Sequence, residues 1–163
     1  MKHAALAAAV LLAACAAAPA QAQTACPPPG WDQARLTALK AADFEIASRR
    51  EREAFARAIT ACLASPDPAL RDGIAFEALS HMLRARQIGV STQTALINDL
   101  LPRLESADPQ GFERPFAALV LSELARAERL NSHFTDSMRA DVLNRSIAYF
   151  VGVRDYRGFD DHE

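Results

Sequence analysis

The sequence of 163 residues lacks a strong charge of either sign, because 18 lysine and arginine residues oppose 20 aspartate and glutamate residues. Binding to nucleic-acid phosphates needs a net positive surface, so a formal charge of −2 excludes a basic nucleic-acid binder. Six glycines and nine prolines are too few for a collagen-like or linker-like chain. Aromatic residues make up only 7%, yet half of the chain is apolar, with 35 alanines, which excludes a disordered protein. The length favours one domain.

The first 22 residues have the layout of a secretory signal peptide. Lys2 supplies a positive start, residues 4–18 carry no charge, and Ala20-Gln21-Ala22 has the small-x-small form that signal peptidase cleaves. The uncharged run of about 15 residues is shorter than the roughly 20 that a membrane-spanning helix needs. We therefore predict a signal peptide at 1–22, no transmembrane segment, and export to the periplasm. A proline-rich leader at 23–30 and a helical-repeat domain at 31–163 would follow.

A second interpretation of the same segment stays open. The string Leu12-Ala13-Ala14-Cys15 is similar to a bacterial lipobox, in which Cys15 is lipidated and becomes the first residue of the exported protein. A lipid on Cys15 would anchor the protein to a membrane without a spanning helix. Both interpretations predict export, and they differ in whether the product is a periplasmic protein or a membrane-anchored lipoprotein.

Two cysteines remain after cleavage at Ala22, namely Cys26 in the leader and Cys62 near the end of a predicted helix. In an oxidising compartment such a pair tends to form a disulfide. The 35 residues between them give a loop whose closure would stabilise the fold by roughly 3–4 kcal/mol. The alternative is a buried thiol at Cys62 and an exposed one at Cys26. Because an exposed thiol is a liability in that compartment, we favour the disulfide.

The periodicity of apolar residues predicts an all-α fold. Apolar side chains recur every three or four positions, and no segment shows the alternation of a strand. In the last predicted helix this spacing places four residues toward the core: Met138, Val142, Ile147 and Phe150. Short connections favour antiparallel neighbours. The six predicted helices begin at Trp31, Ser48, Asp67, Ser91 or Thr92, Pro115 and Thr135, and Pro102 is expected to shorten the fourth.

Two of these units repeat. Residues 65–68 recur at 106–109, and five identities relate residues 71–85 to residues 42 positions later, which include Leu79 with Leu121 and Ser80 with Ser122. A period near 42 is typical of HEAT and armadillo repeats. The stretch from Asp67 to Leu79 also resembles the HEAT pattern, and this resemblance implies that Asp67 caps a helix and Arg71 donates to a neighbouring one. We therefore expect antiparallel hairpins stacked as a short right-handed HEAT-like or armadillo-like array.

Four segments are similar to the bacterial domain of unknown function 2785 family. They are Pro28-Pro29-Gly30-Trp31 and the residue ranges 67–72, 115–119 and 155–159. The resemblance implies a helical, HEAT-like, exported protein, and it implies no activity. Members of that family continue past the Arg157-Gly158 segment into a stretch with two further histidines. The resemblance therefore implies that the chain is incomplete at its C-terminus relative to the family.

Residues that could carry chemistry are few. Glu77 and His81 share a helix face at spacing i, i+4, but such pairs are usually solvated, and His133 is expected in a turn. The C-terminal stretch holds the one candidate functional cluster, formed by Asp155, Arg157, Asp160 and His162. The bland interpretation is that Asp155 and Arg157 pair around a turn. The functional one is that Asp155 and His162 join the histidines further along as metal ligands or as an acid–base pair.

These observations favour an exported binding or scaffold module over an enzyme. Stacked helix pairs present an extended surface suited to a protein or peptide partner. We expect no catalytic residue, metal site or cofactor in these 163 residues. The alternative is a metal-dependent hydrolase-like enzyme whose site is completed by residues beyond Glu163.

Overall fold

The computed structural model describes residues 25–154, and this part of the chain consists of helices and connecting loops without a strand. The predicted all-α fold class is thus confirmed. Among the described helices, none combines the length and apolar composition that crossing a bilayer requires. In chain order the elements are α1 (Gln33–Ala41), α2 (Arg49–Ala58), the 3₁₀ helix η1 (Ile59–Ala64), α3 (Pro68–Leu70), the π-helical η2 (Arg71–Phe76), α4 (Glu77–Arg84), α5 (Val90–Leu100), the 3₁₀ helix η3 (Pro102–Glu105), α6 (Glu113–Leu130) and α7 (Asp136–Gly152).

Side-chain caps determine where several helices begin. The side chains of Ser48, Asp67 and Thr135 each accept a hydrogen bond from an amide two or three residues later, at 2.9–3.3 Å. Such a cap satisfies an amide that has no partner inside the helix. The predicted helix starts at these three residues are confirmed.

The other starts differ from prediction by one or two residues. Helix α1 begins at Gln33 because Asp32, and not Trp31, is its cap. Helix α5 begins at Val90, directly after Gly89, and α6 begins two residues before Pro115. Pro115 therefore lies within the first turn of α6, where a backbone N–H has no helical partner to lose. The predicted effect of Pro102 is confirmed, because α5 ends at Leu100 and a 3₁₀ turn follows.

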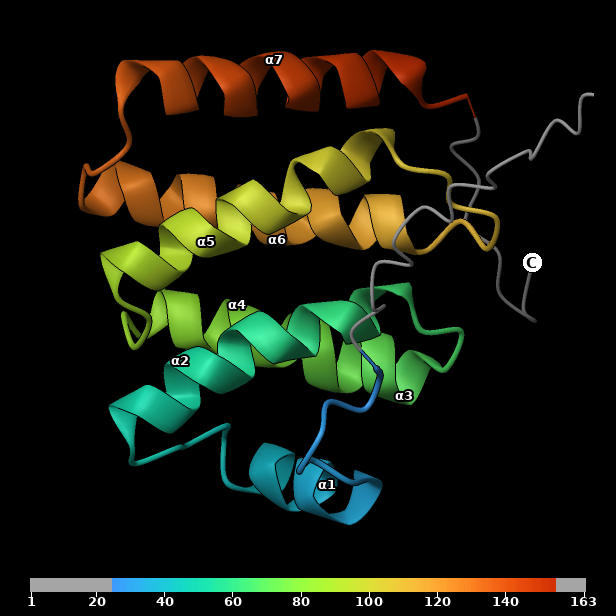
Figure 1. Ribbon diagram of the computed structural model, residues 1–163, viewed down its shortest axis with the longest axis vertical. Helices are drawn as coiled ribbons and strands as arrows, with labels where there is room; N and C mark the ends of the chain where they lie inside the picture. The colour runs from blue at the N-terminus through green and yellow to red at the C-terminus, as the bar shows by residue number, and fades with distance from the viewer. Residues whose placement is uncertain (1–24, 155–163) are drawn as a thin grey trace, which may run out of the picture.

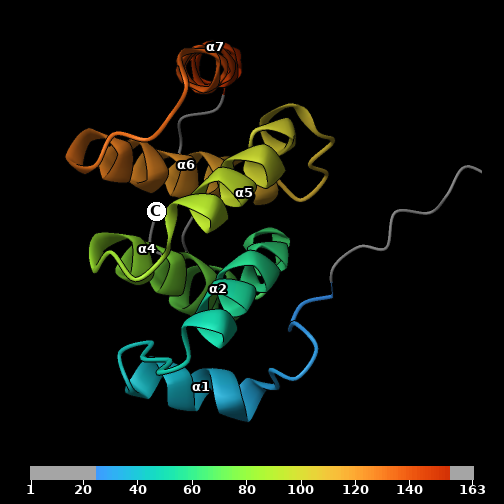
Figure 2. The ribbon, with the colours of Figure 1, turned by 60° about the vertical axis from the view of Figure 1, so that its left-hand side comes forward.

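The helices lie in successive levels between α1 at one end and α7 at the other (Figure 1). A view turned by 60° shows that α2 lies beside α4 in one level and α5 beside α6 in the next (Figure 2). Helix α2 contacts α5, and α4 contacts α6, so the two levels pack directly on each other. Their shared core is rich in leucine, and its largest fully buried side chains are Leu36, Phe55, Ile59, Leu63, Leu79, Met82, Leu96, Ile97, Leu100, Leu104, Val120 and Leu124.

Charged and aromatic contacts also join the two levels. Arg84 on α4 forms a two-pronged ion pair with Glu123 on α6, and the ring of Phe76 meets that of Phe116 edge-on at 6.0 Å. The Glu123 side chain is 9% exposed and the Arg84 side chain 60%, so this ion pair lies at the solvent-facing edge of the contact. The contact between α4 and α6 therefore contains a specific ion pair in addition to apolar packing.

A disulfide joins Cys26 to Cys62, as predicted, with the Cα atoms 5.0 Å apart. Cys62 is fully buried in η1, among the core side chains. The covalent loop that the bond closes contains α1 and α2. The leader is thereby fixed to the middle of the helical body and not to its end.

Helix α7 corrects one prediction, because it has no buried residue. Met138 and Val142 are half-buried, but Ile147 and Phe150, which were expected to face the core, are 52% and 70% exposed. The physical reason is that α7 packs closely on η3 but not along α6, so the face of α7 that points toward α6 is not closed off by that helix. The apolar stripe of α7 is real, but much of it faces an open surface.

Candidate functional site

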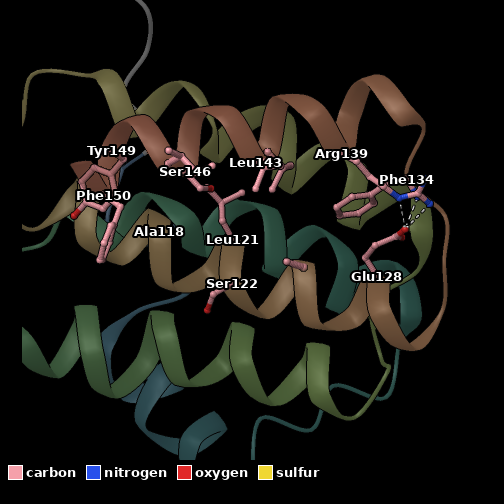
Figure 3. A pocket seen from close by; sticks show the side chains of 13 residues that line it. Ala118, Leu121, Ser122, Glu128, Phe134, Arg139, Leu143, Ser146, Tyr149 and Phe150 are labelled. Atoms are coloured by element: carbon pink, nitrogen blue, oxygen red, sulfur yellow. Dashed lines mark hydrogen bonds and ion pairs between the residues drawn. The ribbon is translucent and has the colours of Figure 1, made fainter. Parts of the chain in front are cut away.

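An apolar depression with a volume of about 610 Å³ lies between α6 and α7. We refer to it as the α6–α7 groove. Figure 3 shows Leu143 and Phe150 of α7 extending toward α6. The residues that line the groove are Ala118, Leu121, Ser122, Ala125 and Glu128 of α6, Phe134 of the connecting loop, and Arg139, Val142, Leu143, Ser146, Ile147, Tyr149 and Phe150 of α7.

The two walls differ in size and exposure. Helix α6 contributes small side chains, with Ala118, Ser122 and Ala125 on one face around the buried Leu121. Helix α7 contributes larger ones, of which Leu143 is 59% exposed. A concave surface that is apolar and open is typical of a site that binds another apolar molecule.

Glu128 anchors α7 to α6 at one end of the groove. Its carboxylate accepts hydrogen bonds from the amides of His133 and Phe134 at 2.6 and 3.0 Å, and from the Ser132 hydroxyl at 2.8 Å. It also accepts two from the Arg139 guanidinium on α7, at 2.8 and 3.2 Å (Figure 3). One carboxylate thus sets the path of the loop and the position of α7.

The same contacts keep Glu128 ionised. Burial favours the neutral acid and by itself raises the pKa of Glu128, but the hydrogen bonds from the His133 amide, Arg139, the Phe134 amide and Ser132 outweigh it. The combined effect of burial and these hydrogen bonds lowers the pKa of Glu128 from 4.5 to about 2. Each donor stabilises the anion, so the charge is satisfied although the residue is buried.

Tyr149 closes the other end of the groove. Burial raises the pKa of the Tyr149 phenol. The guanidinium of Arg114 lies over the Tyr149 ring at 5.2 Å, and its Nε donates to the Leu104 carbonyl at 2.8 Å. Arg114 therefore connects α7 to the first turn of α6 and to η3.

The residues singled out from the sequence lie elsewhere. Asp155, Arg157, Asp160 and His162 are outside the described residues, and so is Cys15. The functional cluster at the first four residues and the lipid anchor at Cys15 therefore stay predictions.

Asp67 and Arg71 lie at the start of the α3–η2–α4 helix. The Asp67 carboxylate accepts from the Ala69 amide, and the buried Arg71 guanidinium donates to the Ser65 carbonyl at 3.1 Å. The same guanidinium lies 4.0 Å from the Phe112 ring centroid, just before α6. Arg71 thus contacts the preceding turn and the next level of the fold.

The two histidines of the helical region have local partners. The His81 ring lies 6.1 Å from that of Phe44, and its neighbour Glu77 forms an ion pair with Lys40 at 2.8 Å. His133 lies in the loop before α7, with its Nδ1 2.8 Å from the Asn131 carbonyl. Across residues 25–154, no group of three or more His, Cys, Asp and Glu side chains is placed to hold a metal ion.

Comparison with protein families gives one match. Residues 96–163 match the family described as "Protein of unknown function (DUF2785)". No curated protein and no solved structure matches the chain. Of the four segments whose resemblance suggested this family, residues 115–119 and 155–159 lie within the match, and those at 28–31 and 67–72 precede it. The predicted resemblance to the domain of unknown function 2785 family is thereby confirmed over residues 96–163, the part of the chain that the family model matches.

Proposed function

We propose that this protein is an exported helical-repeat module that binds a protein or peptide partner in the α6–α7 groove and has no catalytic activity of its own. Its described helices would form a short right-handed array of antiparallel hairpins, similar to HEAT or armadillo repeats. Support comes from α4 and α6, which repeat in sequence at an offset of 42 residues and pack on each other. In such arrays each repeat contacts its neighbours and leaves an extended surface free.

The observation that carries the binding role is the apolar surface left open beside α7. Leu143, Ile147 and Phe150 line the groove, and each of these side chains is more than half exposed. Exposing large apolar side chains in one place is unfavourable in water, and contiguous patches of this kind usually mark interaction sites. A polypeptide that covers them would remove this unfavourable exposure.

Export is supported by the disulfide. The Cys26–Cys62 bond belongs in an oxidising compartment, which agrees with a signal peptide at residues 1–22 and a periplasmic protein. The alternative, a membrane-anchored lipoprotein, differs in its first residue. Intact-mass spectrometry of the exported protein separates the two, because cleavage after Ala22 leaves Gln23 first and lipidation leaves a heavier chain that begins at Cys15.

Site-specific photocross-linking in living cells tests the binding role. A benzoylphenylalanine at Leu143 lies in the groove, and one at the adjacent Asn144 is exposed but outside the groove. We expect an adduct with another polypeptide from position 143 and none from position 144. Adducts from neither position, or equal adducts from both, would contradict the groove as the binding site.

A further inference from the structure

The internal repeat identifies which part of the fold corresponds to the α6–α7 groove. Phe76 at the end of η2 contacts Phe116 of α6, and Leu79, Ser80 and Leu83 share its helix face by their spacing of three, four and seven residues. The residues 42 positions later are Ala118, Leu121, Ser122 and Ala125, and all four line the groove. The groove wall on α6 is therefore the repeat equivalent of the surface on which α6 itself packs.

Two residues of the second copy are more exposed than their equivalents in the first copy, as expected where no helix packs directly on the surface. Ser80 is only 7% exposed beneath the next level, whereas its equivalent Ser122 is exposed. Leu83 is buried, and its equivalent Ala125 is half-buried. Leu79 and its equivalent Leu121 are both buried, so the second copy of the surface, which faces α7 across the groove, is open only in part.

The charge on this surface repeats as well. Arg84 pairs with Glu123 of the covering helix, and the residue 42 positions after Arg84 is Arg126. Arg126 uses its Nε to contact Glu123 of its own helix at 2.9 Å. Within residues 25–154, neither terminal nitrogen of Arg126 donates a hydrogen bond. Arg126 lies outside the groove lining but directly follows Ala125, which is part of it, so its terminal nitrogens could pair with a carboxylate at the edge of the groove.

We propose that the α6–α7 groove binds an amphipathic α-helix of a partner polypeptide that carries an acidic side chain in register with Arg126. The proposal rests on the proposed function, because it assigns the ligand of the same groove. The partner helix would lie on α6 as α6 lies on α4. It would carry larger apolar residues than α6 does, because Ala118 and Ala125 stand where the first copy has Phe76 and Leu83.

The nine residues that follow Arg154 are too few to fill this groove. Helix α6 has 18 residues and is therefore about 27 Å long. As a helix, residues 155–163 would extend only about 14 Å, and the connection from α7 would use part of that length. Residues 155–163 alone could therefore not cover α6 along its length.

A peptide of the α6 sequence, residues 113–130, is the direct probe, because α6 is the helix seen on the equivalent surface. The peptide is labelled with fluorescein, and its binding to the full exported chain is measured by anisotropy. We expect saturable binding that Ser122→Arg weakens at least about tenfold, since the new side chain occupies the groove. Ser91→Arg, on the exposed side of α5, is the matched control and should leave the affinity unchanged.

A double-mutant cycle tests the ion pair. Arg126→Ala in the protein and Glu123→Gln in the peptide should each weaken binding about fivefold, and the second change should add little to the first. Arg50→Ala, which removes an exposed arginine of α2, is the control for net charge. Circular dichroism of each variant verifies that the fold is retained.

Three results would overturn this proposal. Absence of peptide binding while cross-links from Leu143 persist would show that the groove binds something other than such a helix, and the proposed function would stand. A dimer in sedimentation velocity that Ser122→Arg dissociates would assign the groove to a second copy of the chain. Peptide binding seen only after residues 155–163 are removed would assign it to the chain's own C-terminal segment.

Discussion

The ionised carboxylate of Glu128 should be a large single contributor to stability at neutral pH. We consider the substitution Glu128→Gln, which keeps the size of the side chain and removes its charge. Five hydrogen bonds end on this carboxylate, from Ser132, the amides of His133 and Phe134, and Arg139. A glutamine has one carbonyl oxygen to accept them, and its NH₂ group would face other donors. The variant should therefore lose the charge-assisted hydrogen bonds, and its NH₂ group should disturb the arrangement of the donors around residue 128.

The magnitude follows from the pKa. A shift of the Glu128 pKa from 4.5 to about 2 corresponds to about 3 kcal/mol of stabilisation of the folded state above pH 4.5. Because the folded-state pKa is the lower one, this stabilisation is complete at neutral pH and is lost as the pH falls from about 4.5 toward 2. About 2 kcal/mol of it should be gone at pH 3.

Urea unfolding followed by circular dichroism at pH 7, 5, 4 and 3 measures this contribution. We expect the free energy of unfolding of Glu128→Gln to lie about 3 kcal/mol below that of the parent protein at pH 7, and about 1 kcal/mol below it at pH 3. Glu105→Gln is the control, because Glu105 is exposed and 3.5 Å from Arg145. A difference that stays constant from pH 7 to pH 3 would refute the reasoning, and so would a loss equal to that of the control.

Three further predictions use the same unfolding assay. Replacing Cys26 and Cys62 by serine should lower the free energy of unfolding by about 3–4 kcal/mol, because the 35-residue loop is no longer closed; no change would show that the loop entropy does not matter here. Leu124→Ala should cost about 3–4 kcal/mol because Leu124 is fully buried, whereas Ile147→Ala should cost less than about 1 kcal/mol, and equal costs would contradict the description of α7. Asp67→Ala should cost about 1 kcal/mol through loss of the cap, and Asp67→Asn, which retains an acceptor, should restore most of it.

Much of the fold was predictable because its causes are local in the chain. Ser48, Asp67 and Thr135 have side-chain oxygens that can cap a helix, and each precedes a segment of helical periodicity, so the starts of three helices could be predicted. The disulfide was predictable because the predicted compartment is oxidising and the predicted cleavage after Ala22 would leave only two cysteines, Cys26 and Cys62.

The candidate site was not predictable, because its causes are contacts between segments that are distant in the chain. Periodicity indicates that Ile147 and Phe150 share a face, but it cannot indicate whether another helix covers that face. Both residues were therefore assigned to the core, and the structure places them at an open groove. Glu128 was missed because two of its donors are loop amides, which every sequence has, and only the path of the loop brings them to one carboxylate.

The covalent link between the leader and the buried Cys62 changes how the domain would respond to mechanical load. A pull on the chain upstream of Cys26 passes through the sulfur atoms into η1, so the 35 residues of the loop, with α1 and α2, carry none of it. Stretching the oxidised domain between its ends should release about 12 nm less contour length than stretching the reduced one.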